Sequence, residues 1–266
     1  MLKDALNLLR ANKLILVFGF LSILAEVPQP SFQTLQGNLV LFCTYLPVEL
    51  VVWVVVLIAS GGLISIIHQG SSDKRLTFAQ AWLRGKSKIV SLFGLVLLVI
   101  PIILVGELIL IAATKFPTSA FLWSILFVGH LLFSSIVTLL ITFGRCAIMI
   151  DDLKAWAAGW TSLRITRNSF IRILVITGTF YLIRSLVIGV LIAILASGFI
   201  GTRLPTPLTL DYSTYQKLLA TPIISGANWA IDLILYPLET IILTLAYLKF
   251  TKEISYPTLA EKQTTA

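Results

Sequence analysis

The sequence predicts an all-α membrane protein: a polytopic bundle of about six transmembrane helices, with short amphipathic helices at the cytoplasmic surface and a parallel internal repeat. Three observations predict this fold class. Hydrophobic residues make up 58% of the 266 residues and charged residues only 12%. The apolar residues gather in runs close to the length of about 20 residues that a helix needs to cross a bilayer. Basic residues concentrate in every second segment between these runs.

The small number of charged residues argues against a soluble domain. Soluble domains carry about 25% charged residues, whereas this chain has 20 basic and 12 acidic residues among 266. The excess apolar surface therefore has to face lipid. The net charge of +8 does not indicate nucleic-acid binding, because the basic residues lie in short segments between apolar runs and not on one solvated surface.

Six segments are apolar enough to be interpreted as transmembrane helices. The first is short and also resembles a signal peptide, but Ile23 at the minus-three position makes a poor cleavage site and favours a retained helix. The fourth and fifth are long enough to tilt or to extend past the bilayer. The six segments are Leu14–Val27, Pro47–His68, Ile89–Ala113, Ala120–Ile150, Phe170–Ile200 and Ile224–Lys249.

The positions of lysine and arginine predict the orientation. Fifteen of the 20 basic residues lie in the N-terminal segment, in the segments after the second and fourth spans, and at the C-terminus. The alternate segments contain only Lys115, Arg203 and Lys217. Because basic loops remain in the cytoplasm, both termini are predicted to be cytoplasmic. Asn38–Pro47 and Gly201–Gly226 are then predicted to lie outside.

Aromatic residues mark both predicted membrane surfaces, where amphipathic rings are favoured. Trp82, Trp156 and Trp160 are the predicted anchors at the cytoplasmic surface. The predicted outer belt consists of Phe42, Tyr45, Trp53, Trp123, Tyr212, Tyr215 and Trp229.

Two predicted cytoplasmic segments, Asp73–Phe93 and Asp151–Ile171, resemble each other at a shift of 78 residues. Trp82 aligns with Trp160, which is informative because tryptophan is rare. Each segment has the pattern of an amphipathic helix in the headgroup layer, and residues 13–20 are a weaker third copy. Residues 1–266 are thus predicted to form one membrane domain with repeat-like units of about 1–69, 73–150 and 151–250 and a polar cytoplasmic tail, 251–266.

The starts of the two amphipathic helices carry helix-capping residues. Thr77 and Gln80 form a capping-box pattern ahead of the first helix. Asp151 or Asp152 is predicted to cap the second helix, because a side-chain oxygen at this position accepts a hydrogen bond from a free backbone N–H.

The repeated segments DKRLTFAQAWLRGKSKIVSLF and DDLKAWAAGWTSLRITRNSFI, with the end YPLETIILTLAYLKFTK, carry a resemblance to a known family. They resemble the six-span membrane domain of some bacterial glycerophosphodiester phosphodiesterases and related stand-alone uncharacterised bacterial membrane proteins. The resemblance implies a multi-pass protein of the cell inner (plasma) membrane. It implies no catalytic residue, because the phosphodiesterase site belongs to a separate soluble barrel with paired histidines.

Five ionisable residues lie within the predicted spans: Glu107, His130, Arg184, Asp232 and Glu239. Such residues are costly in lipid and mark candidate functional sites. Arg184 is predicted to pair with Glu239 or Asp232 from the neighbouring span, and Glu107 is placed to meet His130. These groups either form ion pairs that fix helix packing or line a polar cavity for a solute or proton.

A row of small residues in the fifth span predicts close helix packing, because small side chains let two backbones approach. Its members are four residues apart and fit either an internal or an external partner helix. They are Ser185, Gly189, Ala193, Ser197 and Gly201.

The sequence contains no Walker A, GxGxxG, GxSxG or HExxH motif. His130 with Ser134 and Ser135 is the one weak indication of an intramembrane enzyme, so no catalytic residue, cofactor or metal site is predicted. Cys43 and Cys146 fall near opposite membrane surfaces and are not expected to pair.

Two functions therefore remain open. The first is a non-enzymatic scaffold or factor in envelope or lipid homeostasis, whose basic tryptophan-bearing helices bind anionic lipids at the cytoplasmic face. The second is a small transporter or channel that uses the buried charges. The sequence names no substrate, protein partner or oligomeric state.

Overall fold

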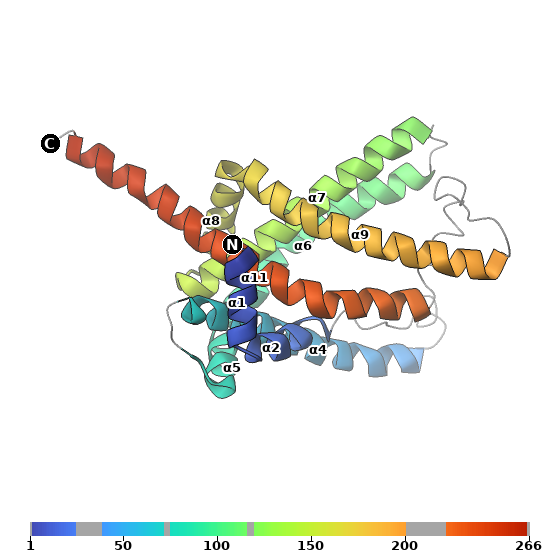
Figure 1. The fold of residues 1–266 in the computed structure, drawn as a ribbon, viewed down its shortest axis with the longest axis horizontal. Helices are drawn as coiled ribbons and strands as arrows, with labels where there is room; N and C mark the ends of the chain where they lie inside the picture. The colour runs from blue at the N-terminus through green and yellow to red at the C-terminus, as the bar shows by residue number, and fades with distance from the viewer. Residues whose placement is uncertain (1, 25–38, 72–74, 116–119, 201–221, 265–266) are drawn as a thin grey trace.

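In this computed structural model, the regular structure of the described residues consists of helices (Figure 1). The structure describes residues 2–24, 39–71, 75–115, 120–200 and 222–264. In chain order, its helices are α1 (Leu2–Ala11), α2 (Leu14–Ser22), α4 (Leu39–Gly70), α5 (Phe78–Ser87), α6 (Ile89–Lys115), α7 (Ala120–Ile150), α8 (Ala155–Asn168), α9 (Phe170–Ile200) and α11 (Pro222–Thr264).

Four of the described helices contain segments long and apolar enough to cross a membrane. A fifth results if α1 and α2, which meet at 103°, together form one span. These apolar helices agree with the prediction of a helical membrane protein. The described residues contain fewer than the six predicted spans. The four segments are Pro47–Gly70 in α4, Ile89–Gly106 in α6, Phe170–Val190 in α9 and Trp229–Glu253 in α11.

The first predicted span, Leu14–Val27, differs most from the structure. The helix α2 ends at Ser22 after 9 residues, and its axis turns sharply from that of α1. At the bend, the Asn12 side-chain oxygen accepts a hydrogen bond from the Leu14 backbone N–H at 3.1 Å. This bond satisfies a helix-start donor, so the chain can begin a new helix in a new direction.

Two other predicted boundaries change, and one predicted span keeps its bounds. The predicted outer segment Asn38–Pro47 is helical from Leu39 onward, with Pro47 inside α4, because the apolar residues before it continue the helix. The predicted polar tail, 251–266, continues α11 as far as Thr264, since lysine and glutamate are good helix formers. The fourth span, Ala120–Ile150, coincides with α7, of which Ser135–Ile150 is the described apolar part.

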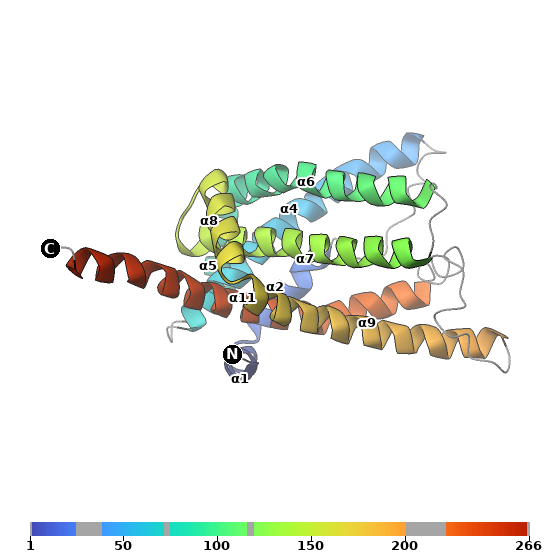
Figure 2. The same cartoon turned by 90° about the horizontal axis from the view of Figure 1, so that it is seen from above.

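The long helices α4, α6, α7, α9 and α11 extend in a common direction (Figures 1 and 2). The short helices α1, α5 and α8 lie crosswise near one end of this bundle, which we call the short-helix end. Two apolar clusters form the core beside it. One joins α7, α8 and α11 around Phe143 and Tyr247, and the other joins α2, α4 and α5 around Phe18.

The helices α4 and α5 approach closely because both carry glycine at their crossing. A Cβ atom added at Gly85 of α5 would lie 2.1 Å from the carbonyl oxygen of Ile58 in α4. A Cβ atom at Gly62 would lie 2.4 Å from the ring of Phe18. These contacts leave no room for a larger residue, so the glycines allow α2, α4 and α5 to form one core.

The loop between α7 and α8 connects three parts of the bundle. Asp151 accepts a hydrogen bond from the Tyr247 hydroxyl of α11, and Asp152 forms an ion pair with Lys88. Asp152 has a φ of 58°, and Lys154 precedes α8 without a side-chain cap. The predicted capping by Asp151 or Asp152 is therefore wrong, because both carboxylates bind other parts of the chain. The predicted capping box of Thr77 and Gln80 is confirmed.

The three predicted tryptophan anchors occupy different environments. Trp82 packs against Phe18 and stacks on Phe78, so it belongs to the core as well as to the surface. Trp156 and Trp160 of α8 are 64% and 56% exposed, with ring centroids 5.9 Å apart. Of the three predicted anchors, the two on α8 are thus the exposed ones.

The described part of the predicted packing ridge on α9 is exposed. Ser185 and Gly189 are exposed, and a Cβ atom at Gly189 would meet nothing within 4 Å. The side chains of Ala193 and Ser197, and Gly201 as a whole, lie outside the described residues. Close packing through Ser185 and Gly189 within this chain is therefore not observed.

Candidate functional site: a charged cavity between four helices

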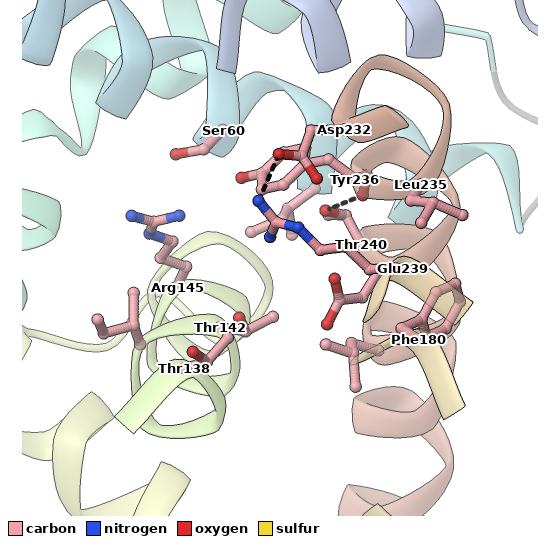
Figure 3. Close-up of a pocket in the computed structure, with 14 residues that line it drawn as sticks. Ser60, Thr138, Thr142, Arg145, Phe180, Asp232, Leu235, Tyr236, Glu239 and Thr240 are labelled. Atoms are coloured by element: carbon pink, nitrogen blue, oxygen red, sulfur yellow. Dashed lines mark hydrogen bonds and ion pairs between the residues drawn. The ribbon is translucent and has the colours of Figure 1, made fainter. Parts of the chain in front are cut away.

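A cavity of about 270 Å³ lies between α4, α7, α9 and α11 (Figure 3). Its wall contains four charged side chains, two arginines and two carboxylates, together with hydroxyl groups and apolar side chains. The lining residues are Ser60, Ile64, Thr138, Ile141, Thr142, Arg145, Phe180, Arg184, Asp232, Leu235, Tyr236, Glu239, Thr240 and Leu243.

Helical periodicity explains why these side chains converge. On α11, Asp232, Tyr236 and Glu239 follow one another by four and three residues, so they lie on one face. On α7, Thr138, Thr142 and Arg145 have the same spacing. The two polar stripes face each other across the cavity (Figure 3).

One ion pair crosses the cavity wall. The Arg184 Nη2 of α9 lies 2.7 Å from the Asp232 Oδ2 of α11. The side chain of Asp232 is 9% exposed and that of Arg184 is 35% exposed. Of the two partners predicted for Arg184, Glu239 and Asp232, the structure pairs it with Asp232.

Glu239 lies two turns after Asp232 on α11 and directs its carboxylate into the cavity (Figure 3). It experiences attraction from Arg184 and repulsion from Asp232. Arg184 donates its short hydrogen bond to Asp232. Within the described residues, no hydrogen bond or ion pair engages the Glu239 carboxylate.

Arg145 is the site residue that the sequence prediction missed. In the sequence it is a basic residue near the end of the fourth span, beside the cytoplasmic segment. In the structure it comes from α7 and directs its guanidinium into the cavity, across from Asp232 and Glu239 (Figure 3). Its Nε is buried without a hydrogen-bond partner among the described residues. The stripe of Thr138, Thr142 and Arg145 is the sequence signal that could have indicated it.

The remaining two predicted polar residues are not tested by this geometry. Glu107 lies in α6 and His130 in α7, at positions whose side chains fall outside the described part of the structure. The site thus unites Arg184, Asp232 and Glu239 from the predicted set and adds Arg145.

The groups that line the cavity are suited to binding a polar ligand. In the ranges that the structure describes, no group of three or more His, Cys, Asp and Glu side chains is placed to hold a metal ion. What the cavity offers a ligand is charge and hydroxyl groups in a space within the bundle.

The fold and the cavity define a class: a helical protein with apolar helices long enough to cross a membrane and a charged cavity between them. Comparisons with known protein families, with curated proteins and with solved structures find no match to this chain. Its function is therefore argued from the cavity itself.

Proposed function

We propose that this chain is a non-enzymatic membrane protein that binds a small polar solute in the charged cavity and passes it across the membrane. The observation that carries this proposal is Arg145, which lines the cavity and whose Nε has no hydrogen-bond partner among the described residues. Charges that only hold helices together are normally paired, because an isolated charge in a low-dielectric interior costs on the order of several kcal/mol. A guanidinium and a carboxylate that lie on opposite walls of one cavity, neither in an ion pair within the described residues, favour a ligand site.

The size and depth of the cavity support transport of a small molecule. Its volume of about 270 Å³ is close to the lower end of ligand pockets, roughly 300–1,000 Å³. Arg184 lies fourteen residues after Phe170, which is roughly 21 Å along a helix, and a bilayer core is about 30 Å thick. Arg145 lies five residues before the end of α7. The cavity would thus extend from mid-membrane toward the short-helix end.

Accessibility of the cavity to water tests this proposal. In a Cys43→Ser and Cys146→Ser background, Thr142→Cys should react with a small membrane-impermeant methanethiosulfonate, because Thr142 lines the cavity. The matched control is Leu139→Cys, at a fully buried position on the same helix. Equal protection of both cysteines would mean that no aqueous solute reaches the cavity, and the proposal would fail.

We also propose six spans with both termini in the cytoplasm, together with a parallel repeat. Three short helices, α1, α5 and α8, lie at the same end of the bundle, and at most two residues separate each of them from the next helix. The same thiol reagent tests the orientation with Lys154→Cys at that end. Labelling only in inverted membrane vesicles is expected, whereas labelling only in right-side-out vesicles would reverse the orientation.

A second candidate function is a scaffold that binds the anionic lipids of the inner membrane. The exposed pair of Trp156 and Trp160 favours it, since tryptophan is suited to the headgroup layer. Arg164 and Arg167 are exposed on the same helix and are suited to attract lipid phosphates. The resemblance to phosphodiesterase membrane domains is compatible with either candidate.

A further inference from the structure

We infer that the solute of the cavity is a small zwitterion, whose carboxylate binds Arg145 and whose ammonium group binds Glu239. This inference rests on the proposed function and specifies its ligand. It follows from which charges of the cavity are already paired, from their placement on opposite walls, and from the volume between them.

The described lining of the cavity is balanced in formal charge. Two guanidinium groups and two carboxylates line it, and one of each is used in the ion pair of Arg184 with Asp232. The open groups are then one cation, Arg145, and one anion, Glu239. A ligand with a net charge would add an uncompensated charge to a low-dielectric site, whereas a zwitterion leaves the balance unchanged.

The two open groups suit the two ends of such a ligand. A guanidinium is planar and presents paired N–H donors that match a carboxylate, and the Nε of Arg145 still lacks an acceptor. The Glu239 carboxylate, when ionised, only accepts hydrogen bonds, so it needs a donor such as an ammonium group. A carboxylate and an ammonium group on one molecule would satisfy both.

Their placement fits a ligand that spans the cavity. Arg145 belongs to α7 and Glu239 to α11, on opposite walls (Figure 3). Thr138 and Thr142 line the wall beside Arg145 and supply neutral polar groups, while Phe180 supplies an apolar surface. The volume of about 270 Å³ is slightly below the usual range of small-molecule pockets, roughly 300–1,000 Å³. The ligand is therefore a short molecule that carries both charges and can place a small apolar part against Phe180.

A simple anion is the competing ligand. It would bind Arg145 but leave the Glu239 carboxylate unpaired in the same cavity, where two negative charges repel strongly. Removing the charge of Glu239 reverses this preference, because the lining then carries one positive charge in excess. The two ligand classes are thus separated by the behaviour of a Glu239→Gln variant.

The experiment measures binding to the full-length protein in lipid nanodiscs by isothermal titration calorimetry. The probes are glycine, β-alanine and γ-aminobutyrate, each beside the acid and the amine of matching chain length. We expect at least one of the zwitterions to bind about tenfold or more tightly than its acid and its amine. Arg145→Gln should abolish this binding, whereas Arg10→Gln, at an exposed position on α1, should retain it.

The Glu239→Gln variant supplies the decisive arm. This variant should bind the zwitterion more weakly and the matching acid more tightly than the unmodified protein does. An unfolded protein cannot show such a gain in affinity. Acids that bind the unmodified protein as tightly as zwitterions would overturn the inference while leaving the proposed function in place. Failure of every probe to bind would also overturn it, and protection of Thr142→Cys from the thiol reagent would then overturn the proposed function as well.

Discussion

At the scale of the residue, the ion pair of Arg184 and Asp232 has a structural role, whereas Arg145 and Glu239 are the charges proposed to bind a ligand. In this pair, one of the two positive charges of the cavity neutralises one of the two negative charges. Its contribution to stability is less than that of a fully buried pair, because Arg184 is 35% exposed and solvent weakens its attraction. The side chain of Asp232 is only 9% exposed. Its charge therefore has little contact with water and depends more strongly on Arg184 for compensation.

Single and double substitutions of this pair test its structural role. Arg184→Met should lower the midpoint of thermal unfolding, because Asp232 remains buried and uncompensated; a full loss of this kind costs about 3–5 kcal/mol, and we expect less here. Asp232→Leu should also destabilise the fold. The double variant should recover part of the loss. Double-variant destabilisation equal to the sum of the single effects would show that the pair contributes no coupling.

The residues also show what limited the site prediction. Arg184 and Asp232 were predictable as partners because each lies deep in an apolar run and neighbouring spans can meet. Arg145 lies only five residues before the end of α7, where a basic residue usually marks the membrane surface. Its role depends on which face of α7 points inward, and the placement of neighbouring helices decides that.

At the scale of the element, the crossing of α4 and α5 depends on backbone contact. The amphipathic pattern of residues 73–93 predicts a helix in the headgroup layer. In the structure, α5 also packs against α4 through Gly85. The sequence of α5 alone does not predict that α4 is its partner, since a single glycine in a helix forms no periodic pattern. Its significance comes from the carbonyl oxygen of Ile58 beside it.

Two glycine substitutions test this crossing against a matched control. Gly85→Ala should destabilise the protein by about 1–3 kcal/mol, the usual range for overpacking, because the added Cβ would lie 2.1 Å from the Ile58 oxygen. Gly178→Ala in α9 meets nothing within 4 Å and should be neutral or slightly stabilising, since alanine favours helices. Thermal unfolding in detergent compares them. Equal effects of the two changes would contradict the close crossing.

At the scale of the whole molecule, one end carries the crosswise helices and their exposed aromatic residues (Figure 2). Trp156 and Trp160 lie on α8 with exposed Arg164 and Arg167. In the proposed scaffold function, the headgroup layer would accept the tryptophan rings and the lipid phosphates would attract the arginines. The two contributions differ in their dependence on lipid charge and on salt.

Thermal unfolding of the full-length protein in nanodiscs separates these contributions. The midpoint should be higher in anionic than in neutral lipid, and high salt should reduce the difference through screening. Combined Arg164→Gln and Arg167→Gln changes should reduce the difference selectively. Combined Trp156→Ala and Trp160→Ala changes should lower the midpoint in both lipids. If lipid charge has no effect on the unmodified protein, attachment through these arginines is excluded.

The sequence by itself determined that this is a helical protein with membrane-length apolar segments, because run length and composition act locally along the chain. It also indicated the capping box of α5 and a pairing of Arg184. Only the tertiary structure decided that Arg145 faces Glu239 across a cavity, that α2 turns by 103° from α1, and that Asp151 binds Tyr247. These features join residues far apart in the chain, so they depend on how whole helices are rotated and placed against one another.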